Sequence, residues 1–181
     1  MAQNTLSRSL HDLGLSAWFG GTLANAVALN AAAGAARPAD AGAVANKGWD
    51  RWTPVNAAAI GAHLVGSVGQ LAGNSRRVAA QDGVGSMALL KTGLTVAALG
   101  VTAYSRALGK VVSDHERVPA ASGTEPTAAT PPKVAAAQKK LAAMQWAVPA
   151  LTGALTVVSS YAGEQQRAAE QARGVRQRLL G

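Results

Sequence analysis

Three long intervals of the chain contain no Asp, Glu, Lys or Arg. They cover residues 13–36, 52–75 and 141–163, and each is at least 23 residues long. A fourth interval, 83–105, is interrupted only by Lys91, whose stem can carry its charge toward lipid headgroups. Because about 20 apolar helical residues cross the core of a bilayer, these intervals predict four transmembrane helices, at about 13–36, 54–73, 86–108 and 141–163.

Composition agrees with a membrane environment. Only 14% of the residues are charged, against roughly 25% in typical soluble proteins. Tryptophan and tyrosine favour the headgroup level, and they lie near the ends of predicted helices at Trp49, Trp52, Tyr104, Trp146 and Tyr161. The predicted fold class is an all-α, polytopic four-transmembrane-helix bundle. The main alternative is a soluble, alanine-rich four-helix bundle, because the mean hydropathy is only +0.11.

Outside the spans the sequence predicts three further segments. Residues 1–12 form an N-terminal segment before the membrane domain of 13–163, and 164–181 form a basic helical tail. Residues 118–132 are rich in Pro, Thr and Ala with a single charge, which predicts a flexible linker between two helix pairs. Thr53 and Pro54 predict the start of the second helix, as N-cap and first-turn proline.

The charge distribution indicates lipid as a partner. The chain has a net charge of +8, and its basic residues border the apolar intervals, where they suit anionic headgroups. They form no dense block with interleaved aromatic residues, so we expect no nucleic acid partner. We expect a multi-pass protein of the bacterial plasma membrane that associates with another membrane protein or with itself. Four spans place both termini on one side, and the Arg-rich tail favours the inside.

Polar residues recur on one face of three predicted helices. Exposed polar groups are costly in lipid, so these stripes should face the bundle interior. There they would bond neighbouring helices, or they would line a path for a solute or for protons, with His63 near mid-membrane. The stripe positions are Asn56, His63, Ser67 and Gln70, then Lys91, Thr95 and Thr102, and finally Gln145, Thr152, Thr156 and Ser159.

Small residues spaced four apart predict close helix packing, within the chain or between copies. The first predicted helix carries Gly20, Ala24 and Ala28 in such a row. The second carries Gly69 and Gly73 as a G-x-x-x-G pair.

The stretch LHDLGLSAWFGG, residues 10–21, resembles the first-helix signature of small four-helix membrane families, roughly L-H-x-L-G-x-x-x-W-x-G-G. Among them are CopD-like copper-resistance proteins and HemJ-like haem-binding oxidases. The resemblance implies a four-helix membrane fold with Trp18, Gly20 and Gly21 as matched positions. It also implies that His11 is a candidate metal or haem ligand, for which His63 is the candidate second ligand. The residues themselves predict no cofactor.

No catalytic motif stands out in the sequence. The chain has no cysteine, it contains no nucleophile elbow, and no carboxylate lies within a predicted span. The leading hypothesis is therefore a non-enzymatic accessory or structural partner in a bacterial membrane. Two alternatives stay open: a haem-binding or redox membrane protein that uses His11 and His63, and a small transporter or channel with a polar-lined interior.

Overall fold

The computed structural model describes the backbone of residues 4–75, 84–115 and 118–180, and the side chains of these ranges as far as Glu164. These residues form an all-α fold without strands, apart from an isolated bridge between Ala120 and Pro126. The first long helix, α1 (Thr5–Ala24), continues through a π-helical turn, η1 (Asn25–Leu29), into α2 (Asn30–Gly34). The other three helices are α3 (Pro38–Gly73), α5 (Val84–Ser113) and α6 (Pro132–Leu180).

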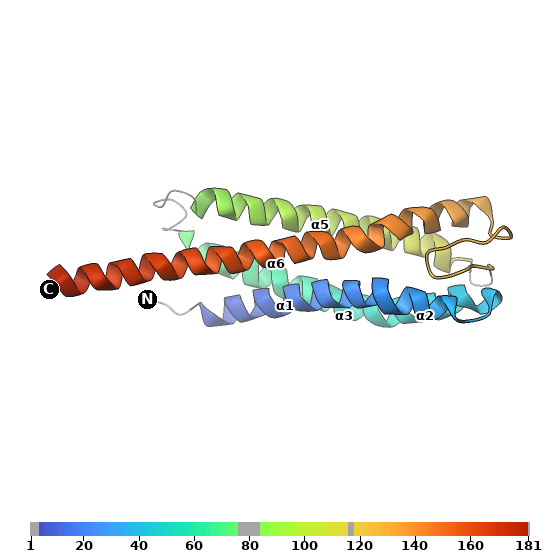
Figure 1. The fold of residues 1–181 in the computed structure, drawn as a ribbon, viewed down its shortest axis with the longest axis horizontal. Coiled ribbons are helices and arrows are strands. Elements are labelled where there is room, and N and C mark those ends of the chain that lie inside the picture. Colours follow the sequence, from blue (N-terminus) through green and yellow to red (C-terminus); the bar gives the residue numbers. More distant parts are fainter. Residues whose placement is uncertain (1–3, 76–83, 116–117, 181) are drawn as a thin grey trace.

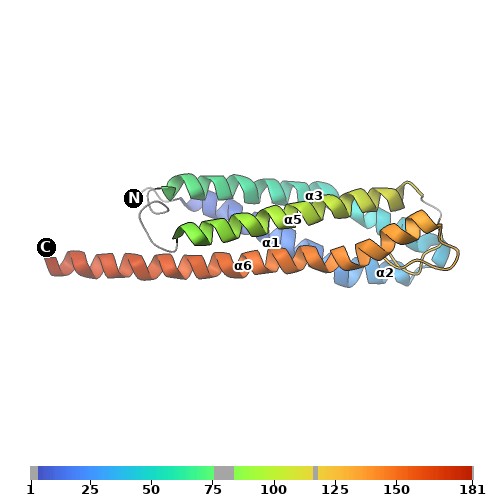
Figure 2. The ribbon, with the colours of Figure 1, turned by 90° about the horizontal axis from the view of Figure 1, so that it is seen from above.

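Two antiparallel hairpins make up the bundle. The helices α1 and α2 pack along α3, and α5 packs along α6, while α1 joins the hairpins by contacting α6 (Figure 1). The helices α3 and α5 contact each other much less. The turn at 35–37 and the loop at 118–131 lie at one end of the bundle, and α6 extends past the other helices at the opposite end (Figure 2).

The predicted start of the second helix is wrong. Helix α3 begins at Pro38, so Pro54 lies inside it. The Thr53 hydroxyl donates to the Trp49 carbonyl at 2.7 Å and caps no helix start. The charged residues between 40 and 51 end the charge-free interval without ending the helix, because a charge opposes burial in lipid but not helical backbone.

The predicted flexible linker at 118–132 forms a hydrogen-bonded loop against the end of the bundle, and its last residue, Pro132, begins α6. The Ala120 N–H donates to the Pro38 carbonyl at 3.0 Å, which ties the loop to the start of α3. The Thr130 hydroxyl donates to the Pro119 carbonyl at 2.6 Å, and both Ala120 and Thr130 are buried. Threonine hydroxyls thus satisfy backbone groups in a segment whose composition offers little hydrophobic core.

Large apolar side chains on the outside and polar side chains in the interior accompany an otherwise apolar core. Large apolar residues are exposed on each long helix, including Leu13 (71%), Val65 (63%), Val96 (62%) and Val157 (69%). Polar side chains are buried in the interior, among them His11, Thr22, Asn30, His63 and Thr152. Burial of polar groups behind an apolar exterior suits a lipid surrounding.

Among the helices described, α5 and the part of α6 at Pro132–Glu164 are long and apolar enough to cross a membrane. The helices α1 and α3 are not in that set. The all-α four-helix bundle is therefore confirmed, whereas four membrane spans are not.

Candidate functional site

Two copies of the pattern H-x-x-G face each other across the first hairpin, His11 to Gly14 on α1 and His63 to Gly66 on α3. A Cβ on Gly14 would overlap the backbone of Ala59 and His63, and one on Gly66 would overlap the backbone of Ser7 and His11. The glycines therefore let the two helices touch at this level. Each histidine lies beside the glycine of the opposite helix.

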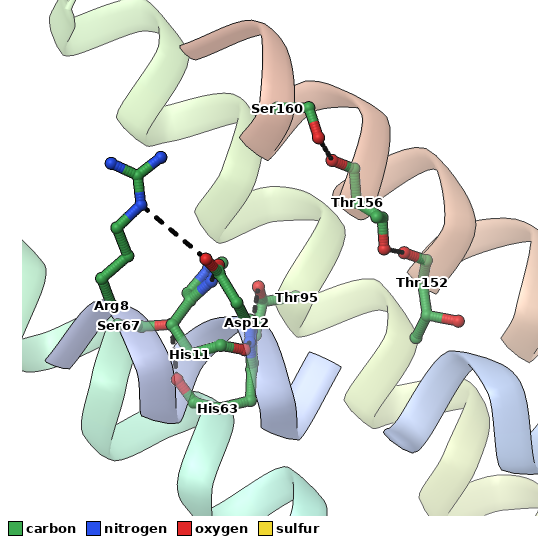
Figure 3. Close-up of polar contacts among 9 residues, drawn as sticks. All are labelled: Arg8, His11, Asp12, His63, Ser67, Thr95, Thr152, Thr156 and Ser160. Atoms are coloured by element: carbon green, nitrogen blue, oxygen red, sulfur yellow. Dashed lines mark hydrogen bonds and ion pairs between the residues drawn. The ribbon is translucent and has the colours of Figure 1, made fainter. Parts of the chain in front are cut away.

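The two histidine side chains contact each other at this point. Their ring centroids are 4.6 Å apart with an interplanar angle of 47°, and both side chains are almost completely buried. His63 Nδ1 lies 3.4 Å from the His11 carbonyl oxygen, and His63 Nε2 lies 3.4 Å from Thr95 Oγ1 on α5 (Figure 3). The pair thus joins α1, α3 and α5.

A carboxylate connects this pair to the surface. Asp12 Oδ1 lies 2.8 Å from His11 Nδ1, and Asp12 Oδ2 lies 3.8 Å from the Nε atom of Arg8 (Figure 3). The Asp12 side chain is 56% exposed. Contacts therefore lead from an exposed carboxylate through His11 and His63 to Thr95, although Asp12 lies just outside the predicted span.

The pair does not fit the alternative of a haem held between His11 and His63. Two imidazoles that ligate one metal from opposite sides hold their nitrogens about 4 Å apart, with the metal between them. Rings that already touch, with centroids 4.6 Å apart, leave no room for a macrocycle between them. The part of the chain that the structure describes also holds no group of three or more His, Asp or Glu residues arranged for a metal.

Every predicted stripe position in α3, α5 and α6 is buried or half-buried. Nε2 of His63 lies 3.4 Å from Oγ1 of Thr95, and the Ser67 hydroxyl donates to the His63 carbonyl. The hydroxyls of Thr152 and Thr156 donate to carbonyls one turn earlier in α6. These bonds tie side chains to their own helices more than to neighbouring ones.

The remaining stripe residues separate into two groups. Lys91 is half-buried one turn before Thr95, and Gln70 and Ser159 each keep a buried polar atom without a partner. Asn56, Thr102 and Gln145 line a cavity nearer the loop end of the bundle.

The predicted packing residues have two different outcomes. Gly20, Ala24 and Ala28 lie on an exposed face, and nothing lies within 4 Å of a Cβ placed on Gly20. The expected packing of this row inside the chain is thus absent. Gly69 and Gly73 do face α1, since Cβ atoms there would overlap Ser7 and Asn4. The Asn4 amide donates to the Gly69 carbonyl at 2.8 Å.

An apolar layer separates the histidine pair from the cavity. Trp18, fully buried, packs with Ala59, Ala98 and Val148, and with Ile60 and Leu99 beside them. Along α3 and α5 these residues lie between His63 and Asn56 and between Thr95 and Thr102. The ring of Trp18 is 6.1 Å from that of His63.

The cavity has a volume of about 360 Å³ and lies between α3, α5 and α6 near the loop end. A side-chain network forms part of its wall: the Asn30 amide donates to Gln145 Oε1 at 2.7 Å, and Trp49 Nε1 donates to Asn30 Oδ1 at 3.3 Å. Arg106 and Asp50 lie at its exposed edge, 4.0 Å apart. Three helices are thus tied together beside an open space.

No family model, no curated protein and no solved structure matches this chain.

Proposed function

We propose that this chain is an integral membrane protein that serves as a non-enzymatic accessory or structural partner in a bacterial membrane, with all four long helices crossing the bilayer. The observation that supports this best is the number of large apolar side chains on the outside of the bundle, together with polar side chains in its interior. Leucine and valine side chains are exposed on both hairpins and aromatic ones on the second, while His63, Asn30 and Thr152 are buried among apolar residues. Water would favour the opposite arrangement.

The first hairpin carries exposed apolar side chains despite its modest average hydropathy. In the part of α3 that follows Pro54, His63 and Gln70 are buried or half-buried, whereas the exposed charges of α3 lie before Pro54. Its exposed positions include Val55, Val65 and Val68. A lipid surrounding contacts only the outward face, so such a helix can be inserted beside partners that cover its polar stripe.

In this proposal the interior polar groups are structural and not catalytic. The hydroxyls of Ser67, Thr152 and Thr156 all donate to backbone carbonyls, and a hydroxyl so used is not activated as a nucleophile. The exposed row of Gly20, Ala24 and Ala28 gives α1 and η1 a strip of small residues on their outer face. Small side chains allow the close approach of a partner helix in lipid.

Single-cysteine crosslinking in native membranes tests this function, and the chain has no cysteine of its own. We expect Ala24→Cys to give a discrete adduct with another membrane protein or with a second copy. Gly100→Cys, at an exposed glycine of α5, serves as the control and should give no adduct. Turnover or solute flux by the purified protein in proteoliposomes would contradict a purely structural role.

One observation favours a second candidate, a small proton-conducting transporter. Three titratable side chains, those of Asp12, His11 and His63, contact one another in series from the surface into the bundle. The series ends at Thr95. Histidine can relay protons because its charge changes near neutral pH. Dissipation of a pH gradient across proteoliposomes, abolished in His63→Ala, would support this candidate over the first.

A further inference from the structure

The cavity between α3, α5 and α6 has the dimensions of a small-molecule site. Its volume of about 360 Å³ falls within the roughly 300–1,000 Å³ of typical ligand pockets. Its wall combines apolar side chains, such as Ile60, Leu99 and Val148, with the indoles of Trp49 and Trp52. Sites of this kind bind molecules that are mainly apolar and carry a few polar atoms.

The charges in the wall restrict the occupant. Of the lining residues, Asp50 and Arg106 carry charge, and they lie 4.0 Å from each other with side chains 63% and 54% exposed. The deeper wall is neutral. Because burying an unpaired charge is costly, the part of a ligand that enters the cavity must be uncharged.

Three residues of the wall have unmet hydrogen-bonding capacity. Trp52 Nε1, Asn56 Oδ1 and Thr102 Oγ1 are all closed off from water and have no partner. An indole N–H donates, an amide oxygen accepts, and a hydroxyl does both. Leaving such groups unpaired is unfavourable, because each has lost its hydrogen bonds to water. A carbonyl or hydroxyl oxygen in the cavity would supply a partner to Thr102 or Trp52 after a small side-chain rotation.

From the volume, the neutral wall and these unpaired atoms we infer that the cavity binds an uncharged, lipid-soluble molecule bearing a carbonyl or hydroxyl oxygen. Entry from the bilayer rests on the proposed membrane location. The helices α3 and α5, which both line the cavity, contact each other little along their length, and their exposed faces carry Val55 and Tyr104. Lateral entry between them is the direct route for such a ligand.

Tryptophan fluorescence of the full chain in detergent tests the binding, because Trp49 and Trp52 line the cavity. The probe is decylubiquinone, a neutral carbonyl compound. All measurements use a Trp146→Phe background, since Trp146 is 51% exposed and would report partitioning into the micelle. We expect saturable quenching.

A pair of glycine variants gives the specificity control. Gly109 lines the cavity and Gly100 does not, and a Cβ on either meets nothing within 4 Å. We expect Gly109→Phe to weaken decylubiquinone binding at least tenfold and Gly100→Phe to change it less than twofold. Ala57→Phe, at a second lining position, replaces Gly109→Phe if that variant does not fold. Equal quenching curves for Gly109→Phe, or its replacement Ala57→Phe, and for Gly100→Phe would overturn the assignment of the cavity as the binding site.

Two competitors test the chemical class. A neutral short-chain diacylglycerol should displace decylubiquinone. In addition, Thr102→Val should weaken the binding of decylubiquinone about threefold or more. Decanoate, charged at pH 8, should compete at least tenfold less well. Stronger competition by decanoate would overturn the uncharged assignment. These measurements need no bilayer, so their failure would leave the proposed membrane location to its own tests.

Discussion

The imidazole ring of His11 lies 4.6 Å, centroid to centroid, from that of His63, although 52 positions separate them in the chain. The turn at 35–37 pairs α1 with α3 in antiparallel register, which brings position 11 beside position 63. Gly14 and Gly66 then remove the side chains that would hold the two backbones apart. The histidine contact is therefore a consequence of hairpin register and glycine placement together.

The glycine contact should be sensitive to a single methyl group. A Cβ on Gly66 would overlap the backbone of α1, and overpacking of this kind costs about 1–3 kcal/mol. We expect Gly66→Ala to lower the free energy of unfolding by that amount in an SDS titration. Gly61→Ala, on the same helix with open space around its Cβ, should be neutral or stabilising by up to about 1 kcal/mol. Equal losses in both variants would contradict the close contact.

The bond between His63 and Thr95 should contribute modestly. Its length of 3.4 Å is at the long end for a hydrogen bond, and interhelical polar bonds in membranes average about 0.6 kcal/mol. A double-mutant cycle of His63→Ala and Thr95→Val should give a coupling free energy near that value. A coupling above about 2 kcal/mol would show that this pair, and not the helix contact, holds α5 in place.

Substitution of Asn30 should lower the free energy of unfolding more than the small size of its side chain suggests. Its amide joins α2 to Gln145 on α6 and to Trp49 on α3. Asn30→Leu leaves both partners unpaired, so we expect a loss of about 1–3 kcal/mol in unfolding free energy. The double variant Asn30→Leu, Gln145→Leu should lose less than the sum of the two single variants. Strict additivity would show that the amides do not depend on each other.

Trp18 should be the most destabilising single truncation among the tryptophans. It is completely buried between the two hairpins, and Trp→Ala in a core costs about 3–5 kcal/mol. Trp146, which is 51% exposed, provides the matched control, and Trp146→Ala should cost less than about 1 kcal/mol in detergent. Thermal unfolding followed by circular dichroism measures both. A loss of stability in Trp18→Ala as small as that in Trp146→Ala would contradict a packed apolar layer between the histidine pair and the cavity.

The sequence was enough to predict an all-α bundle, because charge-free intervals, helical spacing and the lack of strand alternation agree. The sequence predicted the start of the second helix wrongly. Pro54 has the sequence context of a first-turn proline, but the packing of α3 on α1 stabilises a helix that begins at Pro38. Spacing of small residues four apart correctly indicated Gly69 and Gly73, which face α1, but it also indicated the exposed Gly20 and missed the closest backbone contacts, at Gly14 and Gly66.

The sequence does contain a pattern that marks the histidine pair, but a comparison of residues four apart does not detect it. The pattern H-x-x-G occurs once in each helix of the first hairpin, and its two copies become neighbours only when the register of the hairpin is known. The cavity left no such signal. It depends on the weak packing of α3 against α5, which is a property of the whole bundle.

The central claim, that lipid surrounds all four long helices, is tested most directly by spin labels on single cysteines in bilayers. The sites are the exposed Leu13, Val65, Val96 and Val157, one on each helix, with Asp114 at the bundle end as the control in water. We predict that the four helix sites collide readily with oxygen and hardly with a water-soluble nickel complex, and that the label at 114 shows the reverse. Nickel accessibility at positions 13 and 65 equal to that at 114 would contradict membrane insertion of the first hairpin.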